Sequence, residues 1–151
     1  MLVAHLLCFI HFASQQGYAN VIQLLLDHGA DVNVQKADLW TPLHLASHNG
    51  HLKVAELLIK HGAHIDVQNE DQKTPLYLAS GNGELEVAHL LVKCGSDINL
   101  QENKGWTPSH SAAWSGHLSL MKLLLGSGVK IGMQNSCKKN TLRSCQGKWE
   151  A

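Results

Sequence analysis

A six-residue motif occurs three times in this chain at a constant spacing along the sequence. It reads Thr-Pro-Leu-His-Leu-Ala from Thr41, Thr-Pro-Leu-Tyr-Leu-Ala from Thr74 and Thr-Pro-Ser-His-Ser-Ala from Thr107, which sets a period of 33 residues. All three prolines of the chain lie in these copies. Such a period is typical of stacked repeat proteins, in which each unit buries its apolar face against its neighbours.

The second and third copies match well beyond the motif. Residues 41–73 and 74–106 align without a gap and are identical at 17 of 33 positions. The identities include an Asn-Gly pair after the motif, a Val-Ala pair, a Leu-Leu pair and a later glycine. Identity spread over the whole period indicates that both copies form the same structural unit.

The residue types predict two helices in each unit. Thr41 can cap a helix through its hydroxyl, and Pro42 suits the first helical position because that amide needs no partner. Asn49-Gly50 suits the end of this helix, since both residues tolerate positive φ. A second helix is expected over residues 52–60, with Gly62 at a left-handed C-cap. Because this second helix is apolar on most sides, neighbouring repeats must cover it on more than one face.

The motif, the glycine after it, the Val-x-x-Leu-Leu run and the second glycine together resemble the ankyrin repeat. The resemblance extends from Cys8 to about Gln134. It implies an all-α solenoid of helix-turn-helix units joined by β-hairpin-like loops, and the alternating residues 64–68 agree with such a loop. The predicted array covers residues 1–134, with repeats at about 8–40, 41–73, 74–106 and 107–134.

The first and last copies are degenerate. Cys8-Phe9 replaces Thr-Pro, although His11, Ala13 and Gly17 remain in register. Residues 1–12 also resemble the apolar core of a secretory signal, but they lack its basic start, so a helix of the array is favoured. Residues 2–7 are too apolar for a solvated end cap, which predicts that the chain begins inside a longer array, as a fragment or a truncated product.

The end of the sequence departs from the pattern in two ways. Ser109 and Ser111 replace leucines of the motif, and we expect them to thin the core of the fourth repeat. Residues 135–151 lack the motif and carry little apolar content, so we expect an irregular or disordered tail.

Composition argues against several classes of partner. The chain has 12 basic and 12 acidic residues and no net charge, so we expect neither nucleic acid nor an anionic membrane as a partner. No stretch approaches the roughly 18 apolar residues of a membrane span. The four cysteines form no C-x-x-C pair, and Cys8 and Cys94 fall on helices of different repeats. A reducing compartment is therefore expected, with the cytoplasm favoured and the nucleus as the alternative.

Eleven histidines raise the question of a metal site. His44 and His48 are four residues apart on a predicted helix, a spacing that suits two metal ligands. A structural role is favoured, because the motif histidine recurs as His11 and His110 and hydrogen-bonds between loops in ankyrin repeats. No cysteine or carboxylate lies near enough in sequence to complete a ligand set. A histidine-based metal or pH sensor is a weaker hypothesis.

No motif in the sequence supports catalysis. It contains no G-x-S-x-G, no catalytic cysteine signature and no phosphate-binding glycine loop. We therefore expect no enzyme activity, no cofactor and no metal. The predicted function is a non-catalytic protein-protein interaction module, an adaptor or scaffold. The alternative is a targeting or regulatory segment of a larger ankyrin-containing enzyme or channel.

The resemblance implies that a partner protein binds the hairpin tips and the exposed side of the first helix of each repeat. The corresponding candidate partner-binding residues are Asp38, Trp40, His48, Asn49, Glu70, Asp71, Lys73, Asn82, Lys104, Trp106, Trp114 and Ser115. Exposed tryptophan is enriched at interface hot spots because it buries a large area at low entropic cost. Trp114 is favoured as a surface residue, whereas Trp40 and Trp106 could equally pack over a neighbouring loop.

Two pairs of loop residues are compared with the ankyrin pattern. Leu39 and Gln72 stand where ankyrin repeats usually have glycine, and Gly105 keeps it, so whether the loops of the second and third copies follow the pattern is left open. Asn33 and Asn99 occupy a position that a 2-oxoglutarate-dependent hydroxylase can modify in the family. An asparagine at this position also stabilises the turn by itself.

Overall fold

The computed structural model describes residues 2–136, with side chains from Phe9 onward. The described residues form eight helices: α1 (Leu2–Gln16), α2 (Ala19–Asp27), α3 (Pro42–His48), α4 (Leu52–Lys60), α5 (Pro75–Asn82), α6 (Leu85–Lys93), α7 (Pro108–Ser115) and α8 (Leu118–Gly126). Within this part of the chain, none of the helices has the length and apolar character needed to cross a membrane.

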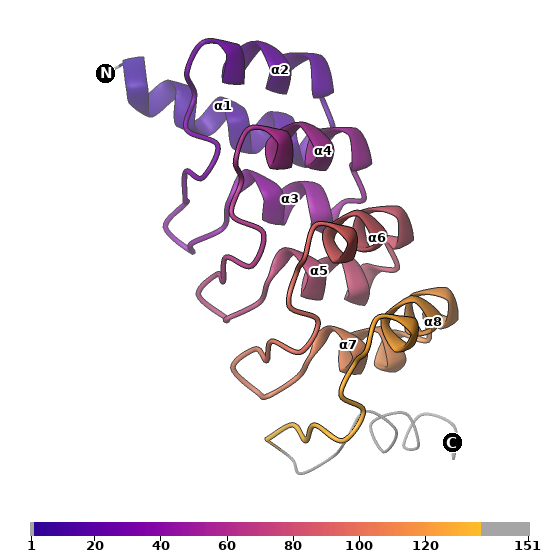
Figure 1. Ribbon diagram of the computed structural model, residues 1–151. Coiled ribbons are helices and arrows are strands. Elements are labelled where there is room, and N and C mark those ends of the chain that lie inside the picture. Colours follow the sequence, from indigo (N-terminus) through magenta and orange to yellow (C-terminus); the bar gives the residue numbers. More distant parts are fainter. Residues whose placement is uncertain (1, 137–151) are drawn as a thin grey trace.

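The helices pair into four antiparallel units that stack in sequence order (Figure 1). The inner helices α1, α3, α5 and α7 form one layer, and the outer helices α2, α4, α6 and α8 form a second layer that lies in front of it in Figure 1. The long loops between repeats project from the same side of the stack. The all-α solenoid predicted from the 33-residue period is therefore confirmed.

The Thr-Pro dipeptides start the inner helices as predicted. The hydroxyls of Thr41, Thr74 and Thr107 each accept the backbone N–H three residues on, and proline follows at the first helical position. In the first copy, Cys8-Phe9 provides neither a hydroxyl cap nor a proline. Helix α1 therefore passes through this position and begins at Leu2.

The core runs without interruption through all four repeats. Each inner helix contributes one fully buried alanine, and these lie at Ala13, Ala46, Ala79 and Ala112. Small side chains at these positions allow neighbouring inner helices to approach closely. The outer helices add larger buried side chains, such as Leu58, Leu91 and Leu124, each 0% exposed. The inner helices also bury larger side chains, among them Ile10, Leu43 and Leu76, so both layers contribute to the core.

The serines of the fourth repeat are buried in the positions of the leucines they replace. Ser109 is 0% exposed, and its hydroxyl lies 2.9 Å from that of Thr107. Ser111 is nearly buried and hydrogen-bonds the hydroxyl of Tyr77. Polar contacts therefore replace apolar packing at the interface between the third and fourth repeats, in agreement with a thinner apolar core.

The first repeat leaves an apolar face uncovered. Val21 is 42% exposed, whereas Val54 and Val87, which occupy the same repeat position, are 1% exposed. Phe12 is 56% exposed and packs edge-on against the ring of Tyr18 at 6.2 Å. These two side chains leave apolar surface on both helices of the first repeat.

The loops of the second and third copies keep the geometry of the fourth. Leu39 and Gln72 both adopt φ of 61°, close to the 74° of Gly105. Their backbone N–H groups donate to the carbonyls three residues earlier, as that of Gly105 does. The open question of the loop geometry is therefore answered: the surrounding contacts hold two residues with side chains in the left-handed conformation that glycine adopts in the fourth copy. Each such residue costs roughly 1 kcal/mol.

We expect Gln72→Gly to raise the free energy of unfolding by about 0.5 kcal/mol. Relief of the left-handed strain outweighs the greater entropy that glycine gives to the unfolded chain. Glu70→Gly is the matched control, since Glu70 is also exposed at this loop tip and has a negative φ. It should lower stability, and urea titrations followed by circular dichroism measure both. A loss of stability in both variants would contradict the assigned strain.

Candidate functional site on the concave face

The loop tips are joined into a continuous row by backbone hydrogen bonds. The N–H of Glu70 donates to the carbonyl of Asp38 at 3.1 Å, and that of Asn103 donates to Asp71 at 3.1 Å. The row continues to Ser136, whose N–H donates to the carbonyl of Lys104 at 2.8 Å. Ser136 belongs to the predicted irregular tail and still extends the row. Residues 137–151 of that tail lie outside the described residues.

The motif histidine connects the inner helices α1 and α3 to the loop that follows. The backbone N–H of Thr41 donates to Nδ1 of His44 at 3.1 Å, so Nδ1 is an acceptor and Nε2 carries the proton. Nε2 then donates to the carbonyl of Lys73 at 3.0 Å. His11 makes the corresponding contact with the carbonyl of Trp40 at 3.1 Å. The predicted structural role of this histidine is thereby confirmed.

Burial keeps the His44 ring neutral. Desolvation lowers its pKa from 6.5 to about 4, and the smaller opposing contributions are hydrogen bonds to the carbonyls of Lys73 and Val67 and the charge of Asp38. In the third repeat Tyr77 takes this position. Burial raises the pKa of its hydroxyl, and the nearby carboxylate of Glu102 adds to the shift.

The two histidines proposed as metal ligands are used in other contacts. Both ring nitrogens of His44 are occupied by Thr41 and Lys73. The ring of His48 packs on Trp40, and its Nδ1 lies 2.7 Å from Nδ2 of Asn82. The described residues contain no group of three or more side chains suited to hold a metal ion.

Aromatic pairs occupy the second and fourth repeats. Trp40 packs edge-on against His48 with ring centroids 5.6 Å apart, and Trp106 packs in the same way against Trp114 at 5.5 Å. Trp40 and Trp106 are half-buried, and each contacts the helix that follows it, while Trp114 is 47% exposed. Of the three tryptophans, Trp114 presents the most surface to a partner.

The third repeat interrupts this aromatic row. Lys73 and Gly81 occupy the positions that hold Trp106 and Trp114 in the fourth repeat. A Cβ atom on Gly81 would lie 2.6 Å from the hydroxyl oxygen of Ser111, so the backbone and this serine approach closely here. The row of side chains therefore has a gap between His48 and Trp114.

The exposed inner surface is uncharged and its rim is charged. The inner-helix segments 9–16, 42–49, 75–82 and 108–115 contain no Asp, Glu, Lys or Arg. The charges lie on the loops, where the ammonium of Lys73 pairs with the carboxylate of Asp71 at 3.1 Å. The separation of uncharged inner helices from charged loops can be seen in the sequence once the repeats are aligned, although the motif residues alone do not show it.

The structure places every predicted partner-binding residue at an exposed or half-buried position. The loop tips carry Asp38, Glu70, Asp71 and Lys104; the helix ends carry His48, Asn49, Asn82, Trp114 and Ser115; Trp40, Lys73 and Trp106 lie between them. Contacts join several of these residues, including Nδ2 of Asn82 donating to the carbonyl of His48 at 2.7 Å. They therefore form one surface across three repeats, which we call the concave face.

The asparagines at the predicted hydroxylation position join neighbouring loops. The side chain of Asn33 accepts the N–H of His64 at 2.8 Å and donates to the carbonyl of Gly62 at 3.1 Å. Asn99 accepts the N–H of Lys130 at 2.9 Å, and Asp66 accepts that of Asp97 at 3.0 Å. The residues at this position thus stabilise the stack.

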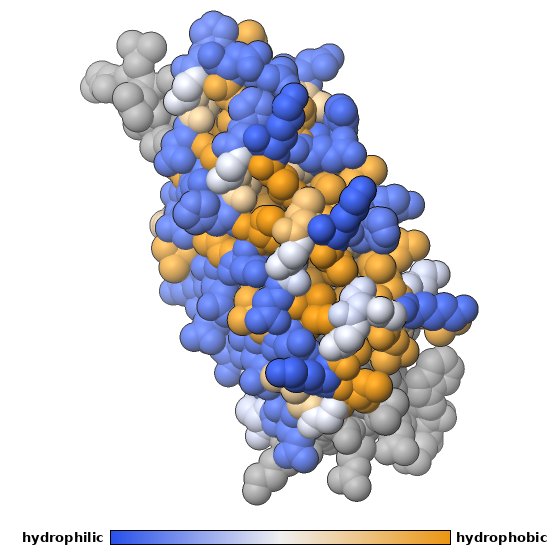
Figure 2. Space-filling model, in the orientation of Figure 1, coloured by the Kyte–Doolittle hydropathy of each residue, from blue (hydrophilic) through white to orange (hydrophobic). Residues whose placement is uncertain are grey.

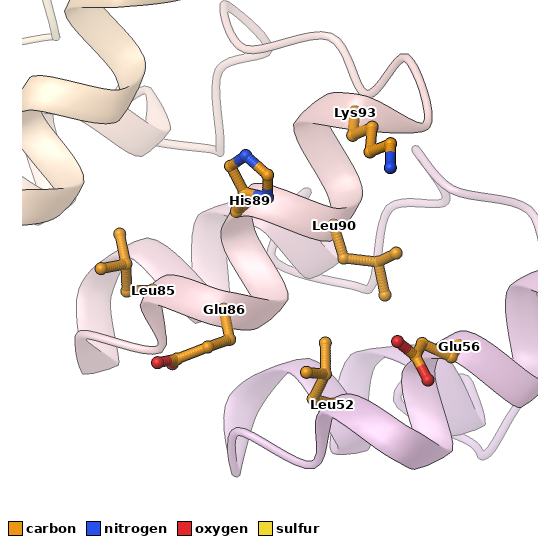
Figure 3. A pocket seen from close by; sticks show the side chains of 7 residues that line it. All are labelled: Leu52, Glu56, Leu85, Glu86, His89, Leu90 and Lys93. Atoms are coloured by element: carbon orange, nitrogen blue, oxygen red, sulfur yellow. The ribbon is translucent and has the colours of Figure 1, made fainter.

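A hollow lies on the opposite, convex side of the molecule, between outer helices. It has a volume of about 450 Å³ and lies between the outer helices α4 and α6 (Figure 3). The space-filling view shows apolar surface over this outer layer (Figure 2). The sequence alone does not reveal this hollow, because it depends on the spacing of two helices from different repeats.

The chain is a helical repeat solenoid. Its helices pair into four stacked units, and histidines and loop asparagines link neighbouring units. A family model for ankyrin repeats, built of three copies, matches residues 10–102 and 65–135. The chain therefore belongs to the ankyrin repeat family. No curated protein sequence matches it. Ankyrin repeats generally serve as protein-protein interaction modules, and the family match consists of these repeats alone.

Proposed function

We propose that this chain is a non-catalytic binding module that holds a partner protein on its concave face. The supporting observation is the uncharged inner surface, bounded by charged loop tips and carrying Trp114 at 47% exposure. A neutral floor with a polar rim is the common organisation of protein interfaces. Adaptor or scaffold roles fit such a surface, since it brings no reacting groups of its own.

Trp114 is the proposed anchor. Its indole is held edge-on by Trp106 at 5.5 Å, so its orientation is largely set before a partner arrives. An aromatic group fixed in this way loses little freedom on binding and buries a large area. In the third repeat, Gly81 places no side chain at the position that Trp114 occupies in the fourth, so no second indole competes with Trp114 for the partner.

The loop tips provide the rim contacts. Glu70 and Asp71 lie at the centre of the row, with Asp38 and Lys104 on the neighbouring tips. Solvent-exposed charges at such positions affect the association rate and partner choice more than the affinity. Trp114 therefore provides most of the affinity for the partner, and the charged loop tips provide most of the selectivity among partners.

We expect Trp114→Ala to lower partner affinity at least tenfold, because it removes the exposed anchor. Affinity capture from cell lysate with quantitative mass spectrometry identifies partners, and titration of an identified partner measures the change. Leu118→Ala is the matched control, since Leu118 is 66% exposed on an outer helix. Equal capture by wild type and Trp114→Ala, with both shown to be folded by circular dichroism, would rule out this face.

A further inference from the structure

The hollow on the convex side is independent of the concave face. Its apolar lining comes from Leu52 of α4 and from Leu85 and Leu90 of α6. Figure 3 shows Leu52 and Leu90 extending into the space between the two helices. Its volume of about 450 Å³ is large enough to receive several side chains of another molecule.

The hollow follows from how the two helix layers pack. The inner helices α3 and α5 pack more extensively than the outer helices α4 and α6. Small residues such as Ala46 and Ala79 bring the inner layer together, and the outer helices consequently diverge on the far side. A groove between parallel outer helices is the kind of surface that receives a third helix.

Charges of opposite sign mark the two ends of the groove. Glu86 lies in the first turn of α6 and Lys93 in its last turn, about two turns or 10 Å away. Both are exposed, and neither belongs to an ion pair among the described residues. Glu56, across the groove, is paired with Lys53 at 3.3 Å. The remaining polar group of the lining is His89, which is also exposed.

We propose that this groove binds a short amphipathic α-helix of a partner protein, lying antiparallel to α6. Two apolar residues of that helix pack on Leu52 and Leu90. An acidic residue near its N-terminus meets Lys93, and a basic residue about two turns later meets Glu86. The spacing of such a pair equals that of the two charges on α6.

The proposed order of charges also favours the bound helix itself. An acidic residue near the N-terminus and a basic residue near the C-terminus both interact favourably with the helix dipole. One order of charges in the partner segment therefore stabilises its helix and also sets the direction in which that helix lies in the groove. A parallel helix of this kind would place like charges together at both ends.

A pair of synthetic peptides tests the proposal directly. One is a side-chain-stapled helix with Glu, two Leu and Arg at relative positions i, i+3, i+4 and i+7 in an Ala/Gln background. The other has Glu and Arg exchanged. We expect the wild-type protein to bind the first about tenfold more tightly by fluorescence anisotropy. In the antiparallel direction the exchange replaces two exposed ion pairs by two repulsions, and in the parallel direction the side chains, which tilt toward the helix N-terminus, are shifted out of register with Leu52 and Leu90.

The double variant Glu86→Lys/Lys93→Glu gives the decisive comparison. Both side chains are exposed, so the fold should persist, and the preference between the two peptides should invert. Amide NMR shifts of the wild type on peptide addition should concentrate on α4 and α6. Equal affinities, no binding of either peptide at millimolar concentration, or shifts confined to the concave face would overturn the proposal.

The two proposed surfaces can be judged separately. Trp114→Ala should leave peptide binding in the groove unchanged, because Trp114 belongs to an inner helix. Loss of binding to both peptides in this variant would contradict a separate convex site. Failure of the peptides to bind at all would leave the proposed function of the concave face untouched.

Discussion

Leu91→Ala should lower the free energy of unfolding by about 3 kcal/mol, within the usual range of roughly 2–5 kcal/mol for a buried leucine. Leu91 is 0% exposed and lies on α6, which packs against α4, α5 and α8. Truncation removes the transfer free energy of the lost methyl groups and leaves a cavity. Packed helices on three sides restrict the collapse that would fill it.

The same chemical change at Leu118 is the control. Leu118 is 66% exposed at the start of α8, so alanine there should change stability by less than about 0.5 kcal/mol. Urea titrations of the three proteins, followed by far-ultraviolet circular dichroism, give the comparison. A loss below about 1 kcal/mol for Leu91→Ala, or equal losses in the two variants, would contradict a continuous core through the third repeat.

The helices were predictable because their signals are local. A hydroxyl and a proline define the start of α3 at Thr41-Pro42, and the 33-residue period transfers that start to two further copies. The start of α1 has no such signal, because Cys8-Phe9 offers neither a hydroxyl cap nor a proline. Apolar residues before Cys8 continue the helix to Leu2, and only the absence of a stop indicated this.

The details of the candidate site depend on contacts between residues far apart along the helix. The sequence placed Trp40 and Trp106 at the surface but left open whether they pack locally. Each ring contacts a residue eight positions later, His48 or Trp114, across the first turns of an inner helix. Motif comparison does not determine such packing, since it depends on side-chain conformation. The hollow between α4 and α6 could not be predicted either, because it depends on how two helices of different repeats are spaced.

Three substitutions at the junction of the third and fourth repeats depend on one another. Tyr77 replaces the motif histidine, and its hydroxyl bonds to Ser111, which replaces a leucine. The hydroxyl of Ser111 in turn occupies space that a side chain on Gly81 would need. Taken singly, each residue departs from the repeat pattern. Together they form a polar contact and a close approach between α5 and α7.

The stability of the array should fall by about 3 kcal/mol through His44 alone as the solution is acidified. The pKa of His44 is about 4 in the folded chain, against 6.5 for the ordinary side chain. Between these values the unfolded chain binds a proton that the folded chain does not, so the free energy of unfolding decreases as pH falls. The contribution is fully present above about pH 6.5 and is lost progressively down to about pH 4.

His44→Gln isolates this contribution from the other histidines. Glutamine does not titrate, and its amide can still donate to the carbonyl of Lys73. The variant should be less stable at neutral pH, yet its free energy of unfolding should fall less steeply on acidification, by about one proton over this range. Urea titrations at a series of pH values measure both slopes. Parallel curves for the two proteins would show that His44 accepts a proton in the folded state as readily as in the unfolded state. Burial of the neutral His44 ring between Thr41 and Lys73 would then not account for the pH dependence of the free energy of unfolding.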